Sequence, residues 1–195
     1  MLKNSFKIYY ALLLTLLVNN ASFAQTYIKG NFVEPLSNIA TTNLLPNSSR
    51  IDHSVAYTKL KAILPSSDYK NASELIGEFW LIDGMLINVI SRKISPNVLK
   101  LDLNAVNYGL SPKINKMKGT TVDMTRVNDY FYEIKVVKNA DVLISYFKTF
   151  PMRKTFIIQD KLGKYTVLGS IYAVQTDYTK AHNYINTLIN SITFK

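Results

Sequence analysis

The sequence predicts an α+β protein, in which an antiparallel sheet of about five to seven strands carries helices packed on it. Three observations support this class. Runs of β-branched and aromatic residues, separated by turn residues, follow one another from residue 119 onward. The pair Asp83-Gly84 divides an apolar stretch, and apolar residues recur at helical spacing near the end of the chain. The short connections between the runs favour antiparallel neighbours.

The first 24 residues have the pattern of a secretory signal peptide. Lys3 and Lys7 precede an apolar run over residues 8–18, and Ser22-Phe23-Ala24 is a small-x-small cleavage pattern. We therefore expect cleavage after Ala24 and a mature protein that is periplasmic or secreted. The apolar run is shorter than the roughly 20 residues of a membrane span. No later run replaces it, so the mature chain is predicted to lack a transmembrane segment.

Residues 25–195 are predicted to form one domain, because domains commonly contain about 150 residues. Residues 25–70 are its irregular part, and polar and turn-forming residues dominate residues 38–52. Residues 27–33 are compatible with a strand. The apolar positions of residues 55–64 are compatible with either a short helix or a strand, and the sequence leaves this alternative open.

Two apolar runs on either side of Asp83-Gly84 predict a β-hairpin, because both residues tolerate the positive φ of a tight turn. The runs are residues 79–82 and 85–90. The preceding segment, residues 73–79, indicates a short helix or a bend.

A helix is predicted after the hairpin. Apolar residues recur at intervals of four, three and four, which places them on one face of a helix; they are Leu99, Leu103, Val106 and Leu110. Asn97 is its candidate N-terminal cap. A basic loop over residues 111–118 follows.

The rest of the chain predicts a strand meander and a closing helix. The strands are expected at residues 120–127, 130–138, 142–150, 155–159 and 164–174. Alternation places Tyr130, Tyr132, Ile134 and Val136 on one face, with Glu133 and Lys135 on the other. The run 142–150 is apolar on both faces, which is typical of a strand covered on both sides. Ala181, Ile185, Leu188 and Ile192 form the apolar face of an amphipathic C-terminal helix that begins near Asp177.

The order of hairpin, helix, meander and closing helix, with its Ser191-Ile192-Thr193-Phe194 ending, resembles the PsbP-like α/β/α sandwich group over residues 80–195. The resemblance implies a non-catalytic domain that binds a protein or assists assembly.

The composition favours an acidic partner and excludes several chemistries. The formal net charge is +10, and it is +8 without residues 1–24, which contain Lys3 and Lys7 but no acid. A basic exported protein is attracted to anionic lipid head groups, acidic glycans or acidic proteins, whereas export argues against nucleic acid. The basic residues include the pairs Arg153-Lys154 and Lys161 with Lys164 across a turn. The absence of cysteine excludes disulfides, thiolate metal sites and cysteine nucleophiles.

No residue pattern indicates an active site, a cofactor site or a metal site. Asp52-His53-Ser54 contains the three residue types of a serine hydrolase, but adjacent side chains diverge, and there is no nucleophile elbow. His182 lies one residue off the apolar face of the C-terminal helix, so we expect its side chain to be exposed or at the boundary of that face. The remaining candidates are a pair of carboxylates, which glycoside hydrolysis requires. Glu74 and Glu78 would share one helix face if their segment were helical.

The aromatic residues are the best indication of a binding surface, because tyrosine and tryptophan combine an apolar ring with a polar group. We expect a binding site where Tyr130 and Tyr132 meet Arg126 or Lys154, with Trp80 as a further candidate.

The sequence therefore favours an exported, soluble, non-enzymatic binding protein. Its partner would be another protein or an acidic envelope component, in an immunity or assembly role. Two alternatives remain. A sheet covered by helices can enclose an apolar cavity, as in a carrier of lipid or another apolar molecule. Two converging acids in a cleft would indicate a hydrolase of envelope polymers.

Overall fold

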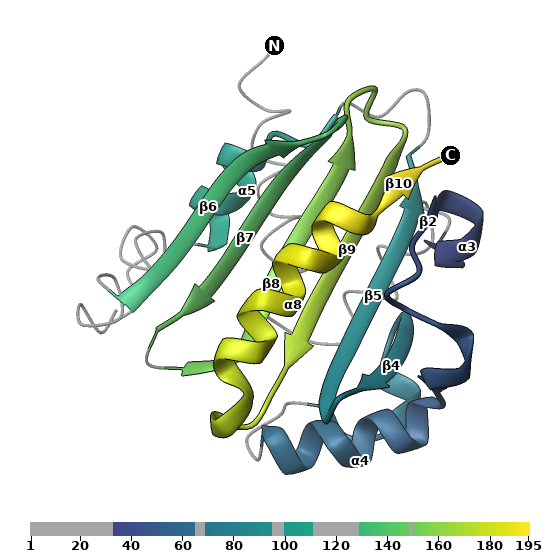
Figure 1. The fold of residues 1–195 in the computed structure, drawn as a ribbon, viewed down its shortest axis with the longest axis vertical. Helices are drawn as coiled ribbons and strands as arrows, with labels where there is room; N and C mark the ends of the chain where they lie inside the picture. Colours follow the sequence, from purple (N-terminus) through teal and green to yellow (C-terminus); the bar gives the residue numbers. More distant parts are fainter. Residues whose placement is uncertain (1–32, 65–68, 95–99, 111–128, 149) are drawn as a thin grey trace.

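The structure is a computed structural model that describes residues 33–64, 69–94, 100–110, 129–148 and 150–195. Its centre is an antiparallel sheet of eight strands in the order β3-β4-β5-β9-β8-β7-β6, with β1 paired to β5 beyond the end of β4 (Figure 1). The strands of this sheet are β1 Val33–Glu34, β3 Arg50–Ile51, β4 Glu78–Ile82, β5 Met85–Lys93, β6 Tyr130–Val137, β7 Ala140–Phe147, β8 Phe150–Asp160 and β9 Tyr165–Tyr172. The α+β class predicted from the sequence is confirmed.

The predicted hairpin is β4–β5. Asp83 and Gly84 form its turn with φ angles of 52° and 81°, which is the left-handed conformation that an Asp-Gly pair adopts readily. The pairing continues through five residue pairs, so the local turn signal also sets the register of the two strands.

The predicted meander is confirmed from β6 to β9, in which each strand pairs with the next. Strand β8 is longer than predicted and includes Pro151, and the register shifts between Tyr146 and Phe147 of β7. The pairing therefore becomes irregular where β7 ends and β8 begins. The predicted strand at residues 120–127 and the basic loop 111–118 lie outside the described residues, as do residues 1–24.

Helix α8, Tyr178–Ser191, follows the short 3-10 helix η3, Gln175–Asp177, and packs along one face of the sheet (Figure 1). We call the face beneath α8 the first face and the opposite one the second face. The buried residues of α8 are Ala181, Ile185, Leu188 and Ile189, which confirms the predicted apolar face. They belong to one hydrophobic cluster with strand residues such as Val142, Ile144, Phe156, Ile158, Val167 and Ile171. Burial of side chains of this size contributes about 1.5–3 kcal/mol each, so this layer is the main core.

Two separate helices cover the second face. Helix α4, His53–Ile63, packs on Phe79, Leu86 and Tyr172, and it settles the open alternative for residues 55–64 in favour of a helix. Helix α5, Leu103–Leu110, packs on Leu143 and Ile157.

The predicted start of α5, the helix expected after the hairpin, is wrong. The helix begins at Leu103, and the Asp102 side chain caps it by accepting the backbone N–H groups of Asn104 at 2.9 Å and Ala105 at 3.4 Å. Residues 100–102 have no regular secondary structure, and Leu101 bonds to Gln159 of β8, with its N–H 3.0 Å from Oε1. This tertiary contact keeps the described residues before Leu103 out of the helix. The predicted cap Asn97 and the predicted apolar position Leu99 lie outside the described residues.

The part of the chain before β4 also contains short elements. They are α3 Leu36–Ile39, β2 Ala40–Thr41 and the turns η1 Asn47–Ser49 and η2 Ala72–Glu74. Strand β10, Thr193–Phe194, pairs with β2 and so ties the end of the chain to this part. Leu36 and Ile39 join the core beneath α8.

Candidate functional site

Two turns meet at the end of the sheet where β6 and β8 finish. Lys138 and Asn139 connect β6 to β7, and residues 161–164 connect β8 to β9. The backbone N–H of Lys161 donates to the Asn139 carbonyl oxygen at 3.0 Å, which joins the two turns. The Ile94 N–H donates to the Lys164 carbonyl oxygen at 2.7 Å, which adds the end of β5. These bonds place several segments with lysines side by side.

We call this group of five residues the lysine rim: Lys93, Lys100, Lys138, Lys161 and Lys164. Each belongs to a segment that ends or turns at this end of the sheet. The stem of Lys100 lies against Gly163, where a Cβ atom would be 3.0 Å from the Lys100 Cβ. The segment before α5 is therefore packed onto the β8–β9 turn.

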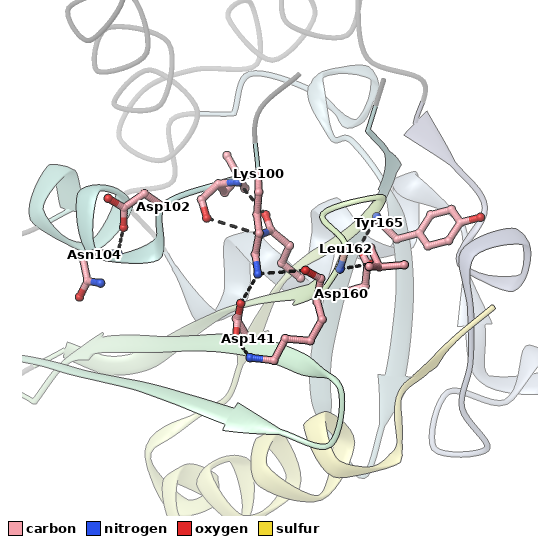
Figure 2. A network of polar contacts seen from close by, with 10 residues as sticks. Lys100, Asp102, Asn104, Asp141, Asp160, Leu162 and Tyr165 are labelled. Carbon is pink, nitrogen blue, oxygen red and sulfur yellow. Dashed lines mark hydrogen bonds and ion pairs between the residues drawn. The ribbon is translucent and has the colours of Figure 1, made fainter. Parts of the chain in front are cut away.

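Asp141, the second residue of β7, partly neutralises the lysine rim. Its two carboxylate oxygens accept hydrogen bonds from the Nζ atoms of Lys100 and Lys161 (Figure 2). The Lys100 Nζ also donates to the Lys161 carbonyl oxygen at 3.3 Å. The bonds from Lys100 and then Lys161 lower the pKa of the Asp141 carboxyl below its usual range, against a smaller opposing effect of burial.

Asp160, the last residue of β8, holds the shape of the β8–β9 turn. Its carboxylate accepts the backbone N–H of Leu162 at 3.2 Å and that of Tyr165 at 2.7 Å (Figure 2). Its carbonyl oxygen accepts the N–H of Gly163 at 3.0 Å, and Gly163 has a φ of +70°. The carboxylate of Asp160 is thus buried and bound to backbone N–H groups of the turn.

Three lysines of the rim are exposed and make no ion pair with residues that the structure describes: Lys93, Lys138 and Lys164. Two exposed apolar side chains stand at the same end of the sheet. Val136 of β6 is 61% exposed and pairs with Asp141 across the ladder, and Leu162 in the β8–β9 turn is 75% exposed. The end of the sheet therefore combines free positive charge with apolar groups in water.

The sequence-predicted aromatic pair lies on the second face of the sheet. The rings of Tyr130 and Tyr132 stack with centroids 6.2 Å apart, and Tyr130 also contacts Phe147 at 5.3 Å. The Tyr130 hydroxyl donates to Asn107 of α5 at 3.1 Å. Desolvation by burial raises the pKa of Tyr130, whereas Tyr132 is 52% exposed. Tyr132 is thus the member of the pair that a partner can reach.

Lys154 lies on the opposite face of the sheet from these tyrosines. It pairs with Tyr146 across the ladder, its Nζ is 3.8 Å from the centroid of the Tyr146 ring, and its side chain is buried. Burial lowers the pKa of Lys154. His182 of α8 contacts the same Tyr146 ring edge-on at 6.4 Å. The structure therefore does not bring Lys154 to Tyr130 and Tyr132.

Trp80, another predicted binding residue, is not beside the tyrosines either. Trp80 is 3% exposed within the core beneath α3 and α8, and its Nε1 has no hydrogen-bond partner among the described residues. Arg126 lies outside the described residues. A binding role for the five predicted residues stays a prediction.

The histidine and the two glutamates considered for catalysis each make other contacts. His53 is the first residue of α4, where its Nε2 is 2.9 Å from the Gly77 carbonyl oxygen and its ring packs on Phe79. Glu74 is in η2, whereas Glu78 begins β4 and pairs with Arg50 at 2.7 Å, so the two carboxylates do not share a helix face. Within the described residues, no group of three or more His, Asp or Glu side chains is placed to hold a metal ion.

Sequence reasoning identified only part of the lysine rim. Lys161 and Lys164 were recognisable as a basic pair across a turn, because they lie three residues apart. Lys93, Lys100 and Lys138 lie far from this pair in the sequence, and only strand pairing and the Leu101–Gln159 contact bring them to the same end.

None of the helices in the described segments is long and apolar enough to span a membrane. Searches against protein-family models, curated proteins and solved structures found no match, so the functional interpretation rests on the geometry and charge of the chain itself.

Proposed function

We propose that this chain is an exported binding protein of the periplasm or the extracellular space, and that its partner is an acidic component of the cell envelope. The observation that supports this proposal is the lysine rim. It contains five lysines from four segments, of which Asp141 engages only two.

The backbone that carries the lysine rim is already ordered in the protein without a partner. The bonds from Lys161 to Asn139 and from Ile94 to Lys164 fix the backbone around the free lysines. A partner would therefore meet a positive surface whose backbone is already ordered, and ordering costs on binding would be confined to the lysine side chains. Positive charge of this kind also accelerates association with an acidic partner at low ionic strength.

The PsbP-like resemblance implies a protein partner, and an acidic protein is one form of the proposed partner. The class of the partner can be identified by treating envelope fragments with protease, with glycan-degrading enzymes or with organic solvent before the binding measurement.

Co-sedimentation with envelope fragments tests the proposal. The protein is collected after export, and its N-terminus is read by mass spectrometry. We expect binding that weakens as salt is added. The rim variant replaces the three free lysines (Lys93→Gln, Lys138→Gln and Lys164→Gln), and it should bind about 100-fold more weakly at low salt, at about 1 kcal/mol for each lysine near an anionic surface.

A matched control removes the same charge elsewhere. Lys59, Lys70 and Lys148 are exposed, lie outside the rim and form no ion pair with described residues. Their triple glutamine variant should retain most of the binding. Equal losses in the two triple variants would assign the binding to net charge and refute a role of the rim, and no binding by the parent protein would refute the proposed function.

A further inference from the structure

We propose that the lysine rim docks on the surface of an anionic phospholipid bilayer, with Leu162 inserted among the lipid head groups. This inference rests on the proposed function and names the chemistry of the acidic partner. It requires a positive surface, an apolar group that projects beyond it and a backbone that keeps the two together.

Leu162 is the most exposed of the large apolar side chains in the described segments. It stands between Lys161 and Lys164 in the turn Lys161-Leu162-Gly163-Lys164, which is the connection between two central strands. A leucine held in water at such a position gains free energy when it enters an apolar layer. The flanking amines are then placed at the depth of the phosphate groups.

The turn cannot easily fold Leu162 back onto the protein. The Leu162 N–H is bound to the Asp160 carboxylate, and the Gly163 N–H is bound to the Asp160 carbonyl oxygen. The positive φ of Gly163 suits a glycine, and the Lys100 stem closes the space beside it. The projection of Leu162 is therefore a property of the folded backbone.

Val136 provides a second apolar group beside the same surface. It lies one residue before the end of β6 and is followed two residues later by Lys138. The side chain is exposed, and its ladder partner Asp141 is the carboxylate that Lys100 and Lys161 engage. Val136 thus adds an exposed apolar group at the end of the sheet that carries the lysine rim.

A bilayer fits this combination better than the other acidic partners. An acidic glycan offers charge to the lysines but no apolar layer for Leu162 and Val136. Each free lysine near an anionic surface strengthens binding by about fivefold, and insertion of the leucine adds about tenfold. Such a surface predicts weak, reversible and salt-dependent membrane binding rather than permanent anchoring.

The experiment uses the exported protein and vesicles of phosphatidylcholine, with or without phosphatidylglycerol. We expect co-sedimentation with the phosphatidylglycerol vesicles only, and its loss at high salt. Leu162→Ser should weaken binding to these vesicles about tenfold while its thermal unfolding is unchanged, because the side chain is exposed. The same variant should bind a lipid-free acidic polymer, heparin, as the parent does.

A fluorescent label measures insertion directly. Because the chain contains no cysteine, Leu162→Cys provides a single attachment point for an environment-sensitive dye. Its fluorescence should rise with phosphatidylglycerol vesicles. The same dye at Val174→Cys, an exposed position after the opposite end of β9, should not respond.

The outcomes separate this inference from the proposed function. Binding to envelope fragments without binding to phosphatidylglycerol vesicles overturns the bilayer inference and leaves the proposed function standing, with a glycan or protein as the partner. Vesicle binding that Leu162→Ser does not weaken, with no response of the dye at Leu162→Cys, overturns the insertion of Leu162. Binding to neither target overturns both proposals.

Discussion

The ring of Phe156 in β8 lies over Gly169, its ladder partner in β9. A Cβ atom at position 169 would be 2.7 Å from Cε2 of that ring and closer still to Cζ. Phe156 is the largest of the side chains that are fully buried in the described residues, and the absence of a side chain at 169 makes room for its ring beneath α8. Glycine in a strand has this use where another group must approach closely.

Gly169→Ala should destabilise the protein by about 2–3 kcal/mol, because the ring of Phe156 must leave its position in a closely packed core. Urea unfolding followed by circular dichroism measures the change. Gly84→Ala is the control: its surroundings are open but its φ is positive, so it should cost only about 1 kcal/mol of backbone strain. A smaller loss for Gly169→Ala than for Gly84→Ala would contradict the packing argument.

Asp141→Asn should lower the free energy of unfolding by about 1 kcal/mol at neutral pH, because the two lysine amines lose their carboxylate. The folded-state pKa of Asp141 is depressed. Its stabilising effect is therefore full above the unfolded-state pKa of about 3.9 and is lost as the pH falls through the folded-state value. Urea unfolding of parent and variant should differ at neutral pH and converge in acid; a constant difference would count against the ion pairs.

The same Asp141→Asn variant should bind anionic vesicles more tightly than the parent. Its amide no longer neutralises Lys100 and Lys161, which are then available to the membrane. We expect a gain of about fivefold or more at low salt, measured by co-sedimentation with phosphatidylglycerol vesicles. A variant that is less stable but binds vesicles more tightly would show that Lys100 and Lys161 stabilise the fold through Asp141 and can also bind the membrane. Weaker vesicle binding would contradict the bilayer inference.

Lys154→Met should leave stability unchanged or raise it by about 1 kcal/mol at neutral pH, since a buried amine is replaced by an apolar side chain of similar length. The folded-state pKa of Lys154 is lowered by burial. Between that value and the unfolded-state pKa of about 10.4, the unfolded chain binds more protons, so the parent gains stability as the pH rises. The variant should lack this gain in urea unfolding at mildly alkaline pH. A strong loss of stability would show that the contact with Tyr146 outweighs desolvation.

Tyr132→Ala distinguishes a membrane from a protein partner. Tyr132 stands four residues before Val136, which is about 13 Å along an extended strand. A bilayer docked at the end of the sheet does not reach it, so affinity for anionic vesicles should stay within about twofold of the parent value. If binding to envelope fragments falls while vesicle binding does not, the partner covers the second face of β6, as the aromatic binding site predicted from the sequence requires.

Several elements were predictable because their signals are local. The Asp83-Gly84 turn sets its own hairpin, and the apolar face of α8 follows from the spacing of Ala181, Ile185 and Leu188. The alternation in β6 is confirmed by Lys135, which reaches Asn186 of α8 on the first face. Residues 55–64 were ambiguous because a short apolar run has similar energy in a helix or a strand until a neighbouring surface covers it. Here the second face of β4 and β5 provides that surface.

The sequence by itself determined the class of fold, the order of most strands along the chain and the basic charge. These depend on turn residues, side-chain periodicity and composition, which act over a few residues. Only the tertiary structure decided that β5 lies beside β9, that Lys154 faces away from Tyr132, and that five scattered lysines share one end with Leu162. The reason is that strand order and register are chosen by burial of the whole sheet between its helices, and each choice moves side chains between faces and ends.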